Sequence, residues 1–218
     1  MIRLDSLRIA FGRTLALDDV SLEISGGITG LFGPNGSGKT TLLRAIAGLV
    51  RPTSGAVYID GIASGMHSED LRGRIGYAGH SSGLYPQLTV GENLDLFARL
   101  YGVGPVEVAG IVDRVDLGPR LPVRAADLSA GLARRVAVAR AVLHDPEVLL
   151  LDEPYANLDD DASELVSETV RSWWTPGRVA VVATHGAKRV KAFAHAGIIL
   201  QNGRVRVAGR YDSKAGVP

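Results

Sequence analysis

The segment from Gly33 to Thr40 constrains the fold of this chain more than any other feature. It reads Gly-Pro-Asn-Gly-Ser-Gly-Lys-Thr and fits the pattern G-x-x-x-x-G-K-[ST]. It follows the apolar run Gly27–Phe32 and precedes a helical pattern that begins at Thr40. A glycine-rich loop between a strand and a helix turns backbone N–H groups and the positive end of the helix toward an anion. The segment therefore predicts a phosphate site where a strand of an α/β sheet meets a helix.

The residue types in this loop indicate a nucleoside triphosphate with Mg²⁺. Lys39 has the length and charge to reach the β- and γ-phosphates, and the Thr40 hydroxyl is a suitable Mg²⁺ ligand. We assign to nucleotide binding Gly33, Asn35, Gly36, Ser37, Gly38, Lys39, Thr40 and Thr41. A phosphate cradle alone does not separate a kinase, a GTPase and a motor, so the rest of the chain has to decide.

Alternation of strand and helix patterns predicts an α/β fold with a largely parallel central sheet. The runs that predict buried strands followed by helices are Gly27–Phe32, 147–151 and 178–183, with a further strand at 75–78. Residues 2–24 alternate more clearly and have turn signals near Gly12 and Asp18, and a short strand is expected at 56–59. These N-terminal segments predict antiparallel strands at one side of the fold.

Between residues 79 and 145 helical spacing replaces the strand pattern. Thr89 and Glu92 form a capping box, and a helical face after them carries Leu94, Phe97, Leu100 and Tyr101. A second helix is expected from 105 to 115. We therefore expect a single unit, 1–218, whose core is formed by 1–78 and 146–218 and whose helical subdomain is 79–145. The end of the chain from Asp212 is expected to be a loose tail.

Ser129 is suited to cap a third helix in this part of the chain. The residues expected on its inner side are Leu132, Val136, Ala139 and Leu143. The arginines at positions 134, 135 and 140 are expected elsewhere on the helix.

Composition excludes several classes of function. Lys and Arg number 24 against 23 Asp and Glu, so no diffuse positive charge indicates a nucleic-acid partner. The chain has no cysteine and therefore neither disulfides nor thiolate metal sites. No apolar run approaches the roughly 18 residues of a membrane span, and the N-terminus lacks a signal-peptide core. We expect a cytoplasmic protein.

A second acidic motif narrows the chemistry. The apolar run Val148–Leu151 ends in Asp152 and Glu153, which is the Walker B arrangement. Asp152 is placed to hold Mg²⁺ through water, and Glu153 to polarise a water that attacks the γ-phosphate. Together with Lys39, this pair predicts hydrolysis of a nucleoside triphosphate.

The order of the remaining motifs resembles that of ABC ATPases over nearly the whole chain. Leu128-Ser129-Ala130-Gly131, ahead of a helix and upstream of Asp152, resembles the family's signature motif. Ala156-Asn157-Leu158-Asp159 is similar to its D-loop, and Ala183-Thr184-His185 to its switch histidine. The resemblance implies a P-loop NTPase core, with an antiparallel β region and an inserted helical lobe.

The resemblance also implies partners and roles. Two nucleotide-binding domains, as a homodimer or a pair, would enclose ATP head to tail between the phosphate loop of one and Ser129 and Gly131 of the other. Asp159 would lie at the same nucleotide, and His185 would act in catalysis. Hydrolysis would drive integral membrane permease subunits, with this chain peripheral on the cytoplasmic face of the cell membrane.

Three positions depart from the commonest form of the family. Phe11 stands where an aromatic residue, often Tyr, stacks on adenine, and Leu132 replaces a Gln after the signature. His80 replaces the Gln that in the family contacts Mg²⁺ and the attacking water, so we count it as a candidate metal and catalytic residue. Imidazole retains ligating ability and adds a charge that changes near neutral pH.

The sequence leaves two candidate classes of transported substrate. Gly79-His80, with Ser129-Ala130-Gly131, resembles the haem-exporter ATPases of cytochrome c maturation. Residues 82–90 equally resemble the ABC-2 type exporters of drugs, lipids or glycans. We also expect the apolar residues Leu84, Tyr85 and Pro86, with Leu94 and Phe97, to border a groove for a short helix of the membrane partner.

Other classes of function lack their usual sequence features. ABC ATPases that act on DNA or the ribosome carry coiled coils, zinc ligands or a second ATPase domain, and none of these is present in this sequence. A regulatory module without turnover would not need Lys39, Asp152, Glu153 and His185. A small-molecule kinase would leave the signature segment without a role.

Overall fold

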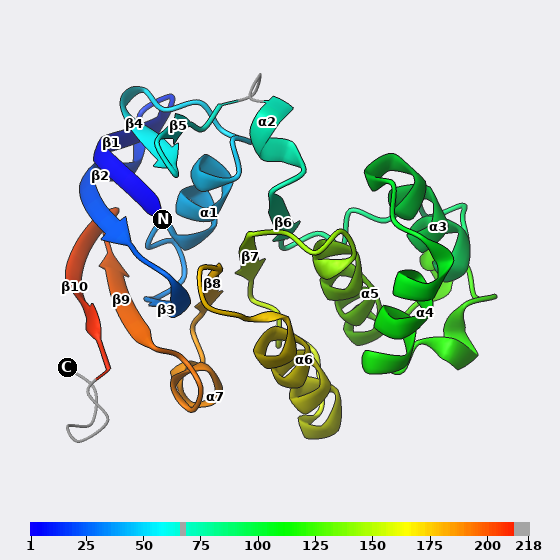
Figure 1. Ribbon diagram of the computed structural model, residues 1–218. Coiled ribbons are helices and arrows are strands. Elements are labelled where there is room, and N and C mark those ends of the chain that lie inside the picture. The colour runs from blue at the N-terminus through cyan, green and yellow to red at the C-terminus, as the bar shows by residue number, and fades with distance from the viewer. Residues whose placement is uncertain (66–68, 212–218) are drawn as a thin grey trace.

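The computed structural model describes residues 1–65 and 69–211 and shows an α/β fold with two sheets (Figure 1). The strands are β1 (Ile2–Phe11), β2 (Thr14–Ile24), β3 (Gly27–Phe32), β4 (Ser54–Ile59), β5 (Ile62–Ala63), β6 (Ile75–Ala78), β7 (Val148–Asp152), β8 (Val179–Thr184), β9 (Ala196–Gln201) and β10 (Arg204–Arg210). The helices are α1 (Lys39–Ile46), α2 (Glu69–Arg72), α3 (Val90–Tyr101), α4 (Pro105–Arg114), α5 (Ala130–Val142), α6 (Asp160–Trp173) and α7 (Ala187–Lys191), with short 3₁₀ turns η1 (Gly118–Arg120) and η2 (Ala125–Asp127). The expected tail from Asp212 lies outside the described residues.

The larger sheet has the strand order β10-β9-β3-β8-β7-β6. Its neighbours are parallel except for the β9–β10 pair, which is antiparallel. This confirms the largely parallel sheet. Strands β9 and β10 were not predicted, and β10 adds an antiparallel edge.

The smaller sheet is antiparallel, with the order β2-β1-β4-β5, which confirms the expected N-terminal β region. The turn near Gly12 is present, with φ at 58°. The expected break near Asp18 is wrong, because β2 continues through it with a shift in register. Asp18 is buried and accepts hydrogen bonds from Arg204 and Arg8, and the hydrogen bond from Arg204 is the main cause that lowers the pKa of this carboxyl.

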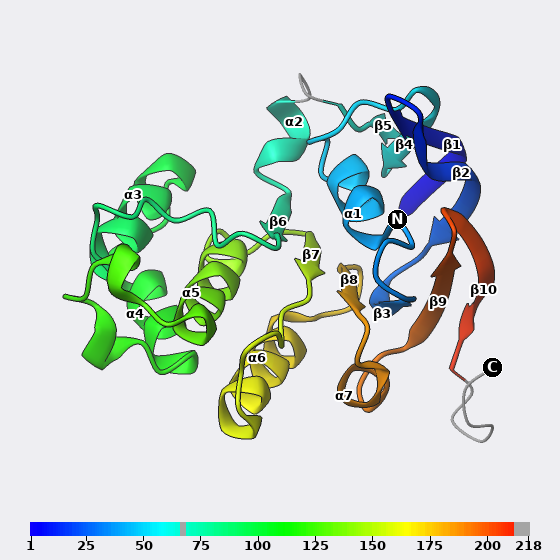
Figure 2. The ribbon, with the colours of Figure 1, turned by 180° about the vertical axis from the view of Figure 1, so that it is seen from behind.

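Helix α1 packs between the two sheets, with Leu71 of α2 in the same layer, and α5, α6 and α7 cover the opposite face of the larger sheet (Figures 1 and 2). Successive strand residues point to opposite faces. Accordingly, Val148 and Leu150 of β7 pack in the α1 layer, whereas Leu149 and Leu151 pack on the helices of the other layer. Burial on both faces explains why β7 reads as a continuous apolar run.

Helices α3, α4 and α5 lie together at one end of the molecule (Figure 1). Across residues 79–145, all of which the structure describes, no strand forms. The capping box of Thr89 and Glu92 is present at α3. Leu94 of α3 is buried, but Leu100 and Tyr101 are 68% and 41% exposed, so the expected single apolar face is wrong at its C-terminal end.

Helix α5 begins after its cap Ser129 as predicted, and its inner side includes Val136 and Ala139. Arg134, which was expected away from the inner side, is instead buried, with 7% of its surface exposed. The reason is hydrogen bonding to carbonyl groups that the spacing of the helix does not reveal. Among the helices of the described residues, none is long and apolar enough to cross a membrane.

Candidate nucleotide site

The loop from Gly33 to Gly38 connects β3 to α1, and close backbone packing requires glycine at both of its ends. A Cβ atom at Gly33 would lie 2.1 Å from the Leu200 carbonyl oxygen, and φ there is 152°. A Cβ atom at Gly38, which has φ of 105°, would lie 2.6 Å from the Ala16 carbonyl oxygen. Strand β9 and the start of β2 thus pack directly on the loop, and only glycine fits these positions.

Lys39 and Thr40 begin α1 directly behind the loop. The Lys39 ammonium donates to the carbonyl oxygens of Gly33 at 2.8 Å and Pro34 at 3.1 Å, so its charge lies over the loop. Asn35 and Gly36 are exposed at the tip of the loop, and Thr41 is partly buried. The loop therefore offers backbone N–H groups and one ammonium to an anion.

Thr40 and Asp152 bring α1 and the end of β7 together. The Thr40 Oγ1 donates to Asp152 Oδ2 at 2.7 Å. Asp152 Oδ1 is buried and, among the residues that the structure describes, has no hydrogen-bond partner; the same holds for the hydroxyl of Ser37 in the loop. A buried carboxylate oxygen without a donor beside a hydroxyl is the kind of oxygen set that binds Mg²⁺ or its water.

Glu153 and His185 lie at the ends of neighbouring parallel strands. His185 Nδ1 is 3.0 Å from Glu153 Oε2, and the His185 backbone N–H donates to Oε1 at 3.0 Å. The Glu153 N–H donates to the Ala183 carbonyl at 2.8 Å, and φ of Glu153 is 49°, a left-handed conformation. This conformation is uncommon for residues other than glycine and is held by the contacts to β8.

The signature segment packs against the D-loop of the same chain. Ser129 is exposed and its hydroxyl accepts the Leu132 N–H at 3.2 Å as the cap of α5. A Cβ atom at Gly131 would lie 2.6 Å from the Asn157 carbonyl oxygen. Asp159 caps α6 by accepting the Ala162 N–H at 2.8 Å.

His80 and Arg134 meet where β6 leads toward α3. The His80 side chain is exposed, and its carbonyl accepts a hydrogen bond from Arg134 Nη2 at 2.9 Å. Arg134 Nη1 donates to the Gly79 carbonyl at 2.5 Å and lies 3.4 Å from the Asp152 carbonyl oxygen. Burial lowers the pKa of the Arg134 guanidinium, whereas the charges of Asp152 and Glu153 act to raise it. The contacts of Arg134 could not be predicted from the sequence, because nothing in the helical spacing identifies the distant carbonyls that it binds.

Phe11 lies at the end of β1, where 54% of its surface is exposed. Its burial pattern is that of a residue outside the core, so an aromatic face is available to a planar ligand. Among the described residues, no three His, Cys, Asp or Glu side chains cluster as a metal site. A bound Mg²⁺ would therefore depend on hydroxyl, water and phosphate oxygens besides Asp152.

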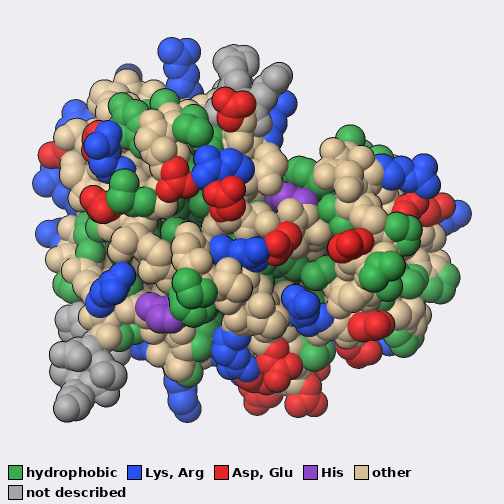
Figure 3. All heavy atoms as spheres, in the orientation of Figure 1, with side chains coloured by type: hydrophobic (Ala, Val, Ile, Leu, Met, Phe, Trp, Pro, Cys, Tyr) green, Lys and Arg blue, Asp and Glu red, His purple; other side chains and the backbone are tan. Residues whose placement is uncertain are grey.

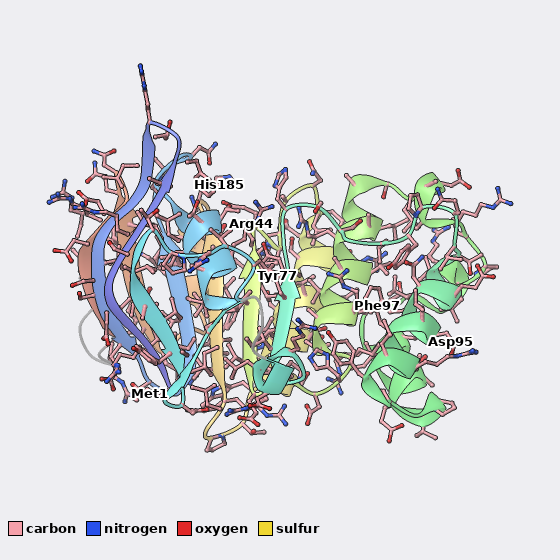
Figure 4. All side chains as sticks on the ribbon, turned by 90° about the horizontal axis from the view of Figure 1, so that it is seen from above. Met1, Arg44, Tyr77, Asp95, Phe97 and His185 are labelled. Atoms are coloured by element: carbon pink, nitrogen blue, oxygen red, sulfur yellow. The ribbon has the colours of Figure 1, made fainter. Side chains whose placement is uncertain are left out.

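A cleft of about 510 Å³ separates the sheet core from the helical part of the molecule. It opens between α2 and α3, where Figure 3 shows a notch in the surface. Tyr77 contributes to its wall from β6, and Phe97 contributes from α3 (Figure 4). The expectation that Leu94 borders a groove is wrong, because this side chain is 1% exposed. Tyr85 is 52% exposed, and its ring centroid lies 6.3 Å from that of Phe97.

Comparison with known proteins gives a consistent result. Residues 17–156 match the family model described as ABC transporter. The ABC transporter ATP-binding protein NatA of Bacillus subtilis strain 168 is 34% identical over 206 residues, which cover 91% of this chain and 83% of that protein. The Nod factor export ATP-binding protein I of Cupriavidus metallidurans is 33% identical over 215 residues, covering 96% of this chain and 71% of that protein.

Solved structures agree. The dimeric structure of MJ0796, a bacterial ABC transporter cassette, has a TM-score of 0.88 and 29% identity, and the match covers 98% of this chain and 100% of that chain. A dimeric post-hydrolysis state of the MJ0796 cassette bound to ADP and Pi has a TM-score of 0.87 and 28% identity over the same shares of the two chains. The chain belongs to the ABC transporter family. It is the ATP-binding subunit of such a transporter and an ATPase.

Proposed function

We propose that this chain hydrolyses ATP at the junction of β3, β7 and β8 and uses the reaction to power export through separate membrane subunits. The observation that carries the proposal is the convergence of two pairs on adjacent residues. Thr40 of α1 binds Asp152, and His185, directly after β8, binds the neighbouring Glu153. Thr40 and Asp152 are suited to bind the cation of the nucleotide, and His185 and Glu153 are suited to position the attacking water.

The residues of the chain have distinct roles in this reaction. Backbone N–H groups of the 33–38 loop bind the phosphates, and Lys39 moves from its loop carbonyls to the β- and γ-phosphate oxygens. Glu153 accepts a proton from the water that attacks the γ-phosphate. His185 holds the Glu153 carboxylate through its ring and its backbone. Phe11 stacks on the adenine.

Thr40 and Asp152 fit a Mg²⁺ ion, with His80 as a further candidate from the 79–80 segment. When bound, Mg²⁺ neutralises phosphate charge during transfer. Thr40 orients one Asp152 oxygen at 2.7 Å and leaves the other without a partner among the described residues. Arg134 binds the backbone carbonyl of His80 and so holds the backbone from which the exposed ring extends.

Two copies are proposed to close head to tail on ATP. Ser129 is exposed at the N-terminus of α5, and the Gly131 N–H lies in the first turn, so a partner's γ-phosphate would meet free donors there. Asp159 lies on the adjacent loop, against which Gly131 packs through Asn157. The dimeric structures of MJ0796 support this arrangement. Removal of the γ-phosphate would remove the negative charge that bridges the two copies and so loosen the pair.

The cleft between α2 and α3 is proposed to receive a helix from a membrane permease subunit. Its aromatic wall includes Tyr77, Phe97 and Tyr101, and Tyr85 stands exposed beside it. A crosslinker placed at Tyr85 in membranes that contain the permease should give an adduct with that subunit. A crosslinker at the exposed Val106 of α4 is the control, and equal labelling of both positions would contradict the proposal.

The relatives favour an exporter of the ABC-2 type over a haem exporter. Both relatives named above are ATP-binding proteins, and one is named for Nod factor export. Haem export remains the second candidate because of the Gly79-His80 pair. Deletion of the gene distinguishes the two readings. Loss of haem-stained c-type cytochromes would favour haem, whereas normal cytochromes would favour an exporter of a drug, lipid or glycan.

The proposed function is tested with the purified chain. It should show Mg²⁺-dependent release of phosphate from ATP, which Lys39→Ala abolishes because the phosphates lose their ammonium partner. A Lys188→Ala variant, on the exposed surface of α7, is the control and should retain activity. Release of phosphate that survives Lys39→Ala would contradict the assignment of the site.

A further inference from the structure

Two arginines of α5 hold the segment that leads from β6 toward α3. Arg134 donates to the carbonyls of Gly79 at 2.5 Å and His80 at 2.9 Å. Arg140 donates to the carbonyls of Gly83 at 2.6 Å and Tyr77 at 3.2 Å. The backbone of residues 77–83 is therefore fastened at four carbonyls to the helix that begins at Ser129. We call these residues, the last two of β6 and the connection after them, the 77–83 loop.

The two guanidiniums occupy different surroundings. Arg140 lies over the Phe97 ring, 4.9 Å from its centroid, and a Cβ atom at Gly83 would lie 2.4 Å from its Nη1. It therefore belongs to the packing of the helical part. Arg134 faces the catalytic strand instead, where its Nη1 also lies 3.4 Å from the Asp152 carbonyl oxygen.

Arg134 is an unusual choice for a buried position if its role is only to stabilise the fold. It makes no ion pair within 4.0 Å among the described residues, and its donors reach carbonyl oxygens. Burial lowers the pKa of this guanidinium, the sign that the position disfavours a charge. Burying a charge is costly unless the charge is paired and hydrogen-bonded, and here only carbonyl acceptors offset that cost. The arginine is therefore better explained by the carbonyl groups whose positions it fixes.

The carbonyl groups that Arg134 binds belong to two parts of the proposed site whose relative position matters for the reaction. Gly79 and the candidate ligand His80 belong to the 77–83 loop, and Asp152 ends β7 directly before Glu153. Arg134 itself lies in the second turn of the helix capped by Ser129. A displacement of α5 thus displaces the His80 backbone relative to Asp152.

We infer that Arg134 is a positioning residue, which links the Ser129 end of α5 to the 77–83 loop and to the end of β7 in the same chain. When the nucleotide of a partner binds Ser129, Arg134 would transmit the resulting displacement of α5 to His80 and Asp152. This inference rests on the proposed function. It adds a residue that does not touch the nucleotide and acts through the backbone of those that do.

The test compares Arg134→Met and Arg134→Lys with Arg135→Met. Arg135 is the matched control, because its guanidinium donates to the Val115 carbonyl at 3.2 Å and pairs with Asp116 inside the helical part. Arg134→Met should lower kcat at saturating MgATP at least tenfold. Its affinity for ATP in EDTA should stay within about twofold of wild type, since the 33–38 loop is not touched. Arg134→Lys should recover part of kcat, because an ammonium can reach one carbonyl but not span both.

A second readout does not depend on activity. Hydrogen exchange of the backbone in a peptide covering residues 77–83 should be faster in Arg134→Met than in wild type, and unchanged in Arg135→Met. Equal loss of kcat in the two methionine variants, or a loss that follows the melting temperature across all three, would overturn the inference. Unchanged exchange in Arg134→Met would also overturn it. A wild-type chain without ATPase activity would count against the proposed function and leave the exchange measurement to decide on Arg134.

Discussion

His185 holds Glu153 from two sides, with its ring Nδ1 3.0 Å from Oε2 and its backbone N–H donating to Oε1 at 3.0 Å. A carboxylate only accepts hydrogen bonds, so Nδ1 carries the proton in this contact. The contact fixes the rotation of the Glu153 side chain beside Asp152, whose own carboxylate binds Thr40. Two neighbouring carboxylates thus have separate partners and are free to take separate roles.

Replacement of Glu153 by Gln should stop turnover and leave ATP binding intact. The amide keeps the size of the side chain but cannot accept the proton of the attacking water, and loss of a positioned base costs ~10²–10⁴-fold in rate. ATP should then hold two copies together, seen as a dimer by size-exclusion chromatography. The control is Glu168→Gln on the exposed side of α6. Near-normal hydrolysis would transfer the role of base to another residue, with His185 the first alternative.

Replacement of Thr40 by Val should weaken the response to Mg²⁺ specifically. The change removes the hydroxyl that donates to Asp152 Oδ2 at 2.7 Å while it keeps the shape of the side chain. Loss of a group that orients a metal ligand costs about 10–100-fold in metal affinity. Calorimetric titration of ATP with and without Mg²⁺ measures the effect. Thr175→Val, at an exposed loop position, is the control. A variant whose Mg²⁺ dependence matches wild type would show that Thr40 has no part in the cation site.

The sequence was sufficient to predict the elements whose signals are local. The run 148–151 is apolar because both faces of β7 are covered, and the caps Thr89 and Ser129 mark helices that the structure contains. The break expected at Asp18 was wrong for a long-range reason, because Arg204 comes from the far end of the chain to pair with it. Arg134 was misplaced for the same reason, since its acceptor at Gly79 is 55 residues away.

The edge of the larger sheet was missed because its pattern resembles a polar tail. Strand β10 has mostly exposed residues, with arginines at both of its ends. Charged side chains protect an exposed edge strand from pairing with other chains, and they also hide the strand in a hydropathy pattern. Strand β9 is recognised as a strand only once β3 is available to pair with it. The predicted apolar face of α3 was wrong at Leu100 and Tyr101. Both side chains are exposed, because α3 ends beside the cleft.

The exchange of His80 for Gln should preserve or raise ATPase activity, whereas His80→Ala should lower it. A neutral imidazole offers one donor and one acceptor, and the glutamine amide also offers both, whereas alanine offers neither. The measurement is turnover at saturating MgATP for the three proteins. Identical turnover in all three would show that the exposed His80 ring has no catalytic part.

His144 lines the cleft and makes the free energy of unfolding depend on pH. Its ring stacks on Tyr101, with centroids 4.0 Å apart and planes at 10°, and Nε2 lies 3.3 Å from the Ile75 carbonyl oxygen. Burial lowers the pKa of His144, while the Ile75 carbonyl and the Asp145 charge act in the opposite direction. Nδ1 is buried and, within the described part of the chain, has no hydrogen-bond partner, so the folded protein holds a neutral ring.

The sign of the effect follows from comparing the two states. An unfolded histidine takes up a proton near pH 6.5, whereas the folded His144 does so only at a lower pH. Above pH 6.5 both states are neutral at this residue and the full stability is present. As the pH falls from about 6.5 toward the lowered pKa, the unfolded state binds more protons and the free energy of unfolding decreases. Below the lowered pKa the loss is complete and levels off.

His144→Phe should remove this dependence, because it keeps an aromatic ring against Tyr101 and removes the titrating group. The loss of the hydrogen bond to Ile75 should make the variant the less stable protein at pH 8. The difference in melting temperature between wild type and variant, measured from pH 8 to pH 5, should shrink or reverse as the pH falls. Contributions from the other histidines are the same in both proteins and cancel in this difference. A difference that stays constant over the whole range would show that His144 titrates alike in the folded and unfolded chains.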